Sequence, residues 1–177
     1  MKHLRICIAI VMLGIAIGAS ALDDGIYIIC SAINRGYVID NDHSGTADGN
    51  NIHLWQMNKT GAQRWLLTNY SNGTVSLANQ SVKPNIMDTR TWHMLDVNNS
   101  DMRRGNNIHL WTWNETQAQR WILTRNSDGS YTIHSAINRN YVVDLDNSRV
   151  ANGTNIQLWE SNGTAAQHWF FVRVSGH

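Results

Sequence analysis

The sequence predicts an all-β domain built from three similar lobes of four short strands each. The first observation is a strand motif that occurs three times, at residues 49–55, 105–111 and 153–159. The second is a Gln-x-Trp tripeptide that closes each copy at the same spacing. The third is the recurrence of turn signals about every dozen residues without a sustained helical period. Pseudo-three-fold closure of such lobes would leave few exposed sheet edges.

The first residues of the chain have the features of a secretory signal peptide. Lys2 and Arg5 precede an apolar run that ends in Ala-Ser-Ala at 19–21. A basic start, an apolar core and a small-x-small end are typical of such peptides. The run is shorter than the roughly 20 apolar residues that a membrane span needs. We therefore expect residues 1–21 to be a signal peptide and residues 22–177 to form a single secreted domain.

The charge argues against a nucleic-acid-binding protein, and the cysteine content excludes a domain stabilised by an internal disulfide. Removal of Lys2 and Arg5 lowers the 14 Lys and Arg residues to 12, against 13 Asp and Glu, so the net charge becomes −1. No basic run is present, so nucleic acid is not an expected partner. Cys7 lies in the signal segment, and Cys30 alone cannot form an internal disulfide. Its apolar surroundings favour burial over a link to another chain.

Turn and strand signals divide the domain into lobes at about residues 24–71, 72–127 and 128–177. Each lobe begins with a hairpin-turn dipeptide, namely Asp24-Gly25, Asn72-Gly73 and Asp128-Gly129. A first strand is expected in each lobe, at 26–29, 75–77 and 131–133. The second strand ends in an aspartate in each lobe and is expected at 37–40, 93–96 and 141–144.

The repeated motif forms the third strand of each lobe and the Gln-x-Trp tripeptide begins the fourth. The spacing from the aspartate to the motif is the same in all lobes only if Asp96, rather than Asp88, belongs to the middle lobe. The middle lobe then carries an insertion around residues 80–92, which contains Pro84, the only proline. We expect this insertion to be a longer hairpin loop.

Alternation along the third strand predicts which side chains face outward. Ile52 and Leu54 share one face and belong in the core, so His53 and Trp55 face the other way. The equivalent outward pairs are His109 with Trp111 and Gln157 with Trp159. An outward aromatic ring beside a hydrogen-bonding side chain suits a sugar, which offers a C–H face and hydroxyl groups. Alternatively, these rings only cover the shoulder of the barrel.

The closing tripeptides have a structural interpretation. Gln and Trp share one face of the chain, so we expect the three indoles to fill the barrel near the pseudo-three-fold axis. These residues are Trp65, Trp121 and Trp169. Their glutamines are expected to hold the preceding turn by side-chain to backbone hydrogen bonds and to shape the rim of each site. These candidate site residues are Gln63, Gln119 and Gln167.

The three Gln-x-Trp tripeptides, each with an upstream aspartate and an Ile-x-Leu-Trp strand, resemble those of the ricin B-chain type lectin family. The resemblance covers residues 24 to about 174. It implies a β-trefoil, in which six strands form a barrel and six form hairpins that cap one end. It also implies a sugar site in each lobe, with an aspartate that accepts from two hydroxyls, a stacking aromatic residue and a polar residue two positions before it. Carried over, these are Asp40, Trp55 and His53, then Asp96, Trp111 and His109, and finally Asp144, Trp159 and Gln157.

The chain departs from this family at one position. Galactose-binding lobes of the family usually carry Asn immediately before the Gln, whereas this chain has Ala62, Ala118 and Ala166. All three lobes share this departure, so a galactose-type ligand is only one candidate. Asp144, Gln157 and Trp159 match the family best, which makes the third lobe the first candidate site. His53 and His109 predict that the first two lobes respond to pH in the imidazole range and the third does not.

Three equivalent tracts carry an Asn-x-Thr sequence between the outward Trp and the Gln. They begin at Asn58, Asn114 and Asn162. The sequence is an acceptor for N-glycosylation. The repeat itself accounts for these residues as copied turn chemistry, and we interpret them as turn residues.

The sequence contains no pattern typical of an enzyme. Glu115 and Glu160 are the only glutamates and lie in different lobes, so they form no pair for glycoside hydrolysis. The histidines are dispersed, and no nucleophile, phosphate-loop or metalloprotease motif occurs. We expect a lectin without cofactor or metal. The alternative is a non-catalytic subunit of a secreted toxin or enzyme that has lost sugar binding and contacts a protein partner, for which an exposed Cys30 would be a tether.

Overall fold

The computed structural model describes residues 22–81, 88 and 91–174. The predicted signal peptide at 1–21 and most of the predicted insertion, with Pro84, lie outside the described residues. Among the residues that are described, none belongs to a helix with the length and apolar character needed to cross a bilayer.

The described residues form twelve β-strands, four in each lobe. The first lobe contains β1 (Gly25–Ser31), β2 (Tyr37–Asn41), β3 (Ile52–Gln56) and β4 (Trp65–Asn69). The second contains β5 (Val75–Asn79), β6 (His93–Val97), β7 (Asn106–Thr112) and β8 (Trp121–Arg125). The third contains β9 (Tyr131–Ser135), β10 (Tyr141–Leu145), β11 (Thr154–Glu160) and β12 (Trp169–Arg173). The predicted all-β class is confirmed.

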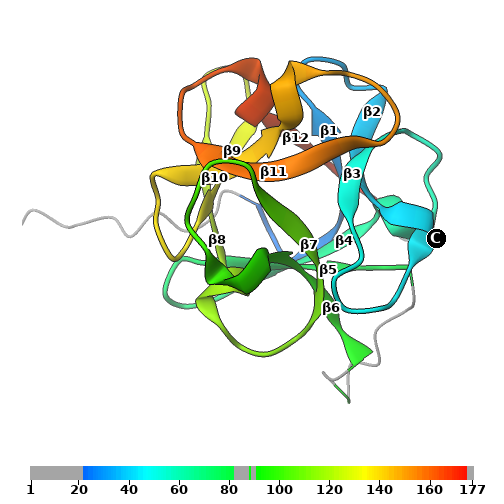
Figure 1. Ribbon diagram of the computed structural model, residues 1–177, viewed down its shortest axis with the longest axis vertical. Coiled ribbons are helices and arrows are strands. Elements are labelled where there is room, and N and C mark those ends of the chain that lie inside the picture. The colour runs from blue at the N-terminus through cyan, green and yellow to red at the C-terminus, as the bar shows by residue number, and fades with distance from the viewer. Residues whose placement is uncertain (1–21, 82–87, 89–90, 175–177) are drawn as a thin grey trace, which may run out of the picture.

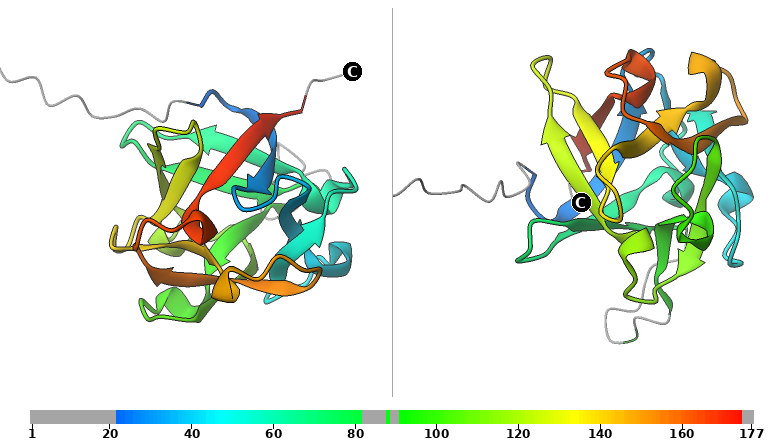
Figure 2. Two further views of the ribbon diagram at one scale, coloured as in Figure 1. Left: turned by 90° about the horizontal axis from the view of Figure 1, so that it is seen from above. Right: turned by 60° about the vertical axis from the view of Figure 1, so that its left-hand side comes forward.

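Six of these strands close into a barrel. β1 pairs with β12 and β4, β5 with β4 and β8, and β9 with β8 and β12. The other six form the hairpins β2–β3, β6–β7 and β10–β11. β11 pairs with β3 and β7 around the centre of the cap that Figure 1 views face on. The left-hand view of Figure 2 shows this cap at one end of the barrel and both ends of the described chain at the other. The fold is the predicted β-trefoil.

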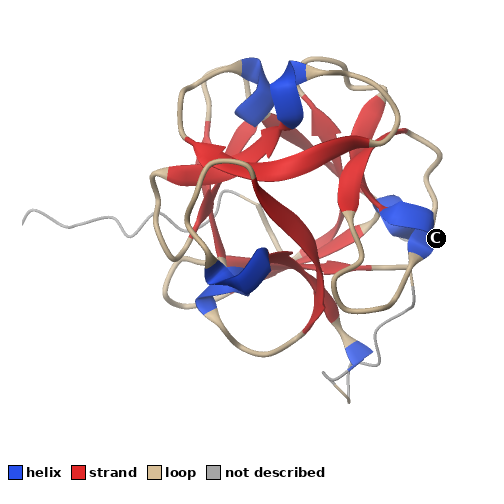
Figure 3. Ribbon diagram, in the orientation of Figure 1, coloured by secondary structure: helices blue, strands red, loops and turns tan. Residues whose placement is uncertain are grey.

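Short 3₁₀ helices lie in pairs around the cap (Figure 3). One helix of each pair follows the second strand of its lobe, and the other precedes the fourth strand. The pairs are η1 (Asp42–Ser44) with η2 (Gly61–Gln63), η4 (Asn98–Ser100) with η5 (Gln117–Gln119), and η6 (Asp146–Ser148) with η7 (Ala165–Gln167). Each pair therefore brings the loop that follows the second strand of a lobe next to the start of the fourth strand of the same lobe.

The core contains the residues that alternation and the Gln-x-Trp repeat predict. Ile52 and Leu54 are fully buried, as are the three predicted indoles. The indole N–H of Trp65 donates to the carbonyl of Ile39 at 3.1 Å. The same bond, also at 3.1 Å, joins Trp121 to Leu95 and Trp169 to Val143. Because a buried indole N–H needs an acceptor, this bond ties the barrel core to the second strand of each lobe.

Three asparagines close the cap around the pseudo-three-fold axis. The amide of Asn107 donates to Asn51 at 2.9 Å, and that of Asn51 donates to Asn155 at 3.0 Å. Asn155 then donates to Asn107 at 2.9 Å, which completes a ring. Each side chain comes from a different lobe, so the ring aligns β3, β7 and β11 with one another.

Two of the three predicted turn dipeptides lie in hairpin turns. Gly73 and Gly129 have φ values of 81° and 84° in the β4–β5 and β8–β9 turns, a backbone conformation that favours glycine. Asp24-Gly25 instead leads into β1, so the hairpin prediction was wrong there. The carboxylate of Asp24 accepts from the backbone N–H of Asn69 at 2.8 Å and holds the start of β1 beside β4.

Cys30 is buried, as the sequence predicts. It packs with Ile28 and Val38 in a small apolar cluster that is separate from the main core and is covered by Phe170. Burial raises the pKa of the Cys30 thiol, and nearby Arg35 opposes this rise. Both effects of burial, lower exposure and a higher pKa, disfavour a reactive thiolate.

Replacement of a core indole tests the structural role of the Gln-x-Trp repeat. Trp65→Ala is expected to lower the free energy of unfolding by about 3–5 kcal/mol, because it opens a cavity and leaves the Ile39 carbonyl without its donor. Trp55→Ala is the matched control, since Trp55 is 37% exposed, and should cost less than about 1 kcal/mol. Equal losses in urea denaturation would contradict this assignment.

Candidate functional site

Each lobe carries an open pocket at the equivalent position, and the three pockets have similar volumes of about 180–190 Å³. The lining of every pocket includes an aspartate, a tryptophan and the side chain two residues before that tryptophan. These residues are Asp40, Trp55 and His53 in the first lobe, Asp96, Trp111 and His109 in the second, and Asp144, Trp159 and Gln157 in the third. The structure therefore brings together each predicted group of three side chains.

In the first lobe, Asp40 on β2 lies directly opposite His53 on β3. Oδ1 of Asp40, a residue only 5% exposed, accepts from Nε2 of His53 at 3.2 Å. A carboxylate can only accept, so Nε2 carries the proton. Nδ1 of the same ring lies 3.7 Å from Oδ1 of Asp42. The imidazole thus stands between two carboxylates, while Oδ2 of Asp40 has no hydrogen-bond partner among the described residues.

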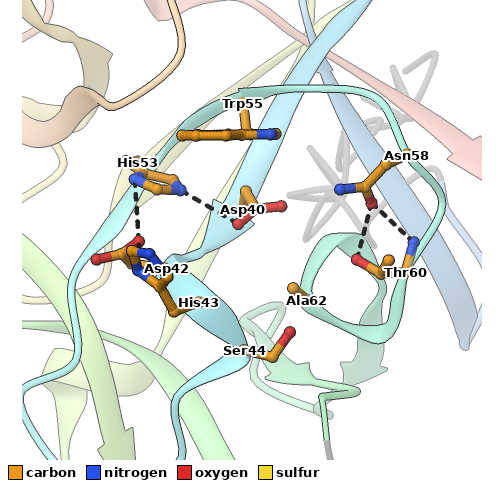
Figure 4. Close-up of a pocket in the computed structure, with 9 residues that line it drawn as sticks. All are labelled: Asp40, Asp42, His43, Ser44, His53, Trp55, Asn58, Thr60 and Ala62. Carbon is orange, nitrogen blue, oxygen red and sulfur yellow. Dashed lines mark hydrogen bonds and ion pairs between the residues drawn. The ribbon is translucent and has the colours of Figure 1, made fainter.

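The indole of Trp55 forms the aromatic wall of this pocket. It stacks on His53 with ring centroids 5.2 Å apart and an interplanar angle of 21°. Figure 4 shows the flat ring above the pocket, with Asp40 below it and Asn58 across from it. Because His53 packs against one part of the ring only, the remainder is accessible to a ligand.

The second lobe repeats this arrangement with one change. Nε2 of His109 donates to Oδ1 of Asp96 at 3.1 Å, and Trp111 stacks on His109 at 5.2 Å. Asp96, not Asp88, is therefore the counterpart of Asp40. Asn98 begins the 3₁₀ helix in the position that Asp42 has in the first lobe. The imidazole of the second lobe consequently has one neighbouring carboxylate instead of two.

The third lobe replaces the imidazole with an amide. Nε2 of Gln157 donates to Oδ1 of Asp144 at 3.0 Å, and Nε2 of Gln167 donates to Oδ2 at 3.0 Å. Burial raises the pKa of the Asp144 carboxyl, and these two hydrogen bonds oppose the rise. Each carboxylate oxygen has a second lone pair and can still accept from a ligand. Trp159 is half-buried and lines this pocket.

Two successive residues with left-handed backbone form the floor of each pocket. In the first lobe these are His43 and Ser44, with φ values of 50° and 55°. The equivalent residues, with φ between 50° and 56°, are Asn99, Ser100, Asn147 and Ser148. Non-glycine residues in this conformation are uncommon and gather where surrounding structure holds them, often at functional sites. No sequence pattern predicted this turn.

The glutamines of the Gln-x-Trp tripeptides are fully buried and stand behind the pockets rather than in their lining. Oε1 of Gln63 accepts from the backbone N–H of Asn58 at 2.7 Å, and Nε2 donates to the carbonyl of Gln56 at 3.0 Å. Gln119 and Gln167 make the equivalent bonds. The prediction that these residues hold the preceding turn is confirmed.

An Asn-x-Thr-x-Ala sequence completes the lining of every pocket. The residues are Asn58, Thr60 and Ala62, then Asn114, Thr116 and Ala118, and finally Asn162, Thr164 and Ala166. From the sequence alone, the asparagines are interpreted as turn residues and the alanines as a departure from the family. Their identical placement in three repeats is the signal that identifies them as part of the site.

In each lobe, the residue immediately after the outward tryptophan forms a hydrogen bond with a side chain of a neighbouring lobe. The contacts join Asp48 to Thr112, Arg104 to Glu160, and Asn152 to Gln56. The guanidinium of Arg104 also lies 6.0 Å from the ring centroid of Trp159. The aromatic wall of every pocket is therefore positioned by two lobes.

The pockets are suited to binding rather than to covalent chemistry. Each combines an aromatic face, a carboxylate acceptor and uncharged hydrogen-bonding side chains, which are the groups that a sugar ring requires. In the part of the chain that the structure describes, no group of three or more His, Cys, Asp or Glu residues is placed to hold a metal ion.

Solved structures of three similar proteins share this fold. A designed three-fold symmetric protein, ThreeFoil, matches 85% of this chain and 100% of its own, with 22% identity and a TM-score of 0.76. An agglutinin of Rhizoctonia solani matches 89% and 100%, with 22% identity and a TM-score of 0.73. A ricin B-like lectin of Macrolepiota procera, solved in complex with lactose, matches 88% and 100%, with 18% identity and a TM-score of 0.69.

No protein of curated function matches this sequence. A family model, by contrast, matches most of the chain. The model of the ricin-type beta-trefoil lectin domain-like family matches residues 17–93 and 83–159, which together span well over half of the sequence. The chain therefore belongs to the ricin-type beta-trefoil lectin domain-like family.

Proposed function

We propose that this protein is a secreted, non-catalytic lectin whose three pockets each bind a sugar. The apolar face of the sugar stacks on the outward tryptophan, and two adjacent hydroxyls donate to the aspartate. The observation that carries the proposal is the repetition of one constellation in three pockets, in each of which the aspartate lies opposite the residue two positions before the tryptophan. The lactose complex of the Macrolepiota procera lectin makes galactosides the first ligands to test.

Single pockets of this kind are expected to bind weakly. They are shallow and contribute one stacking surface and a few hydrogen bonds, so a dissociation constant of ~0.1–1 mM per pocket is expected, or about −4 to −5.5 kcal/mol. Three pockets in one domain raise the apparent affinity for a surface that displays many copies of a glycan. Retention on immobilised sugar should therefore be stronger than the affinity for free sugar.

A glycan array followed by titration of aspartate variants tests the proposal. Replacement of Asp144 by Ala is expected to weaken lactose binding in the third lobe by about 10- to 100-fold, because hydrogen bonds to a charged acceptor are lost. The triple variant of Asp40, Asp96 and Asp144 should lose retention on lactose resin. Asp101→Ala is the control, because Asp101 forms a surface ion pair with Arg103 and lines none of the three pockets. Silence of the wild-type protein on the array at high concentration would favour the alternative of a protein-interaction subunit.

Binding in the third lobe is expected to depend on pH. In the variant with Asp40→Ala and Asp96→Ala, only the third lobe binds. Because burial raises the pKa of Asp144, binding by this lobe should fall on acidification, at a pH above the ordinary aspartate value of about 3.9.

Calorimetric titration of this variant with lactose at a series of pH values measures the profile. Third-lobe binding that persists down to the ordinary aspartate pKa would contradict the role assigned to the buried carboxylate of Asp144.

A further inference from the structure

The amide of Asn58 has a fixed orientation. Its Oδ1 accepts from the backbone N–H of Thr60 at 3.0 Å and from Oγ1 of Thr60 at 2.8 Å. Both partners are donors at these positions, so the acceptor end of the amide must face them and the NH₂ end must face away. The assignment of oxygen and nitrogen in this side chain therefore follows from its hydrogen bonds.

The NH₂ group of Asn58 points into the pocket. Figure 4 shows Nδ2 turned toward the space below Trp55, while Oδ1 faces Thr60. No residue in the described ranges accepts a hydrogen bond from this nitrogen. The backbone N–H of Asn58 is itself held by Gln63 at 2.7 Å, so the whole residue is anchored from the core side.

The same donor occurs in all three lobes. Oδ1 of Asn114 accepts from Thr116 at 3.1 and 2.7 Å, and Oδ1 of Asn162 accepts from the N–H of Thr164 at 3.0 Å. Both asparagines line their pockets. The backbone N–H anchor is the same in all three lobes, so we expect the NH₂ groups of Asn114 and Asn162 to face their pockets as that of Asn58 does.

We propose that Asn58, Asn114 and Asn162 determine the ligand specificity of the pockets by donating a hydrogen bond to an oxygen of the bound sugar. This inference rests on the proposed lectin function. Asp40 only accepts and Asn58 only donates into the first pocket, so a ligand needs a hydroxyl that donates and an oxygen that accepts. Ala62 has no polar side-chain atom and leaves the space between these groups for the ligand. The asparagines thus supply the amide that the alanines lack.

Asn58→Asp removes the donor and preserves the turn. Oδ1 of aspartate can still accept from Thr60, and the chain already uses aspartate in the same type of turn, where Oδ1 of Asp128 accepts from Ser130 at 2.9 and 2.6 Å. The variant should therefore fold. Its second carboxylate oxygen would face the sugar in place of Nδ2 and cannot donate. A sugar oxygen that accepts from Asn58 would therefore lose its donor, or a hydroxyl would have to turn its own proton toward the carboxylate at the expense of its other hydrogen bond.

The matched control is Asn72→Asp. Oδ1 of Asn72 accepts from the N–H and Oγ1 of Thr74 at 3.1 and 2.7 Å, which is the geometry of Asn58. Asn72 lies in the β4–β5 turn and is absent from the lining of all three pockets. The two substitutions make the same chemical change in the same kind of turn, so a difference between them reports on the pocket alone.

The experiment is a lactose titration in the background of Asp96→Ala and Asp144→Ala, with thermal unfolding to verify that each variant is folded. Asn58→Asp should weaken binding by about 10-fold, and Asn72→Asp should leave it within about 2-fold. In the unsubstituted chain, the side-chain NH₂ resonances of Asn58, Asn114 and Asn162 should shift on addition of lactose, and that of Asn72 should not.

The outcomes separate the two claims. If the wild-type protein binds lactose and Asn58→Asp binds it equally well, the donor role is overturned and the lectin function stands. If the wild-type protein binds neither lactose nor any glycan on an array, the lectin function is overturned and the donor role falls with it.

Discussion

The indole N–H of each core tryptophan donates to the backbone carbonyl that lies one residue before a pocket aspartate. Trp65 holds Ile39 in this way, and Asp40 is the next residue. The side chains of adjacent strand residues point to opposite faces, so a carbonyl held by the core places the following aspartate at the pocket. The position of the carboxylate therefore depends on the packing of the barrel, and the three copies of this bond have equal lengths of 3.1 Å.

The three lobes share one backbone architecture, but the polar groups that contact the pocket aspartate differ from lobe to lobe. The first lobe has an imidazole between two carboxylates, the second an imidazole beside one, and the third two amides. Backbone geometry, the stacking ring and the asparagine donor are the same in all three. The lobes are thus expected to recognise similar ligands through different hydrogen-bonding groups beside the aspartate. The ring of Asn51, Asn107 and Asn155 couples the three lobes mechanically.

Much of the fold was predictable because the repeat constrains it. Strand alternation placed Ile52 in the core and Trp55 outside, and the Gln-x-Trp repeat placed Trp65 at the centre of the barrel. The sequence could not show that two left-handed residues form the pocket floor, since backbone conformation there depends on the surrounding packing. Nor could it show the orientation of Asn58. An asparagine suits both a turn and a pocket donor, and only the hydrogen bond from Thr60 to Oδ1 shows that the NH₂ group is turned toward the pocket.

The central claim is that the outward indoles bind sugar while the core indoles support the frame. The chain contains eight tryptophans, and their indole N–H resonances can be observed separately by two-dimensional NMR. On titration with lactose, the resonances of Trp55, Trp111 and Trp159 are predicted to shift, and those of Trp65, Trp121 and Trp169 to remain in place. Unchanged resonances for all three outward indoles in the presence of every sugar that the protein retains would contradict the account.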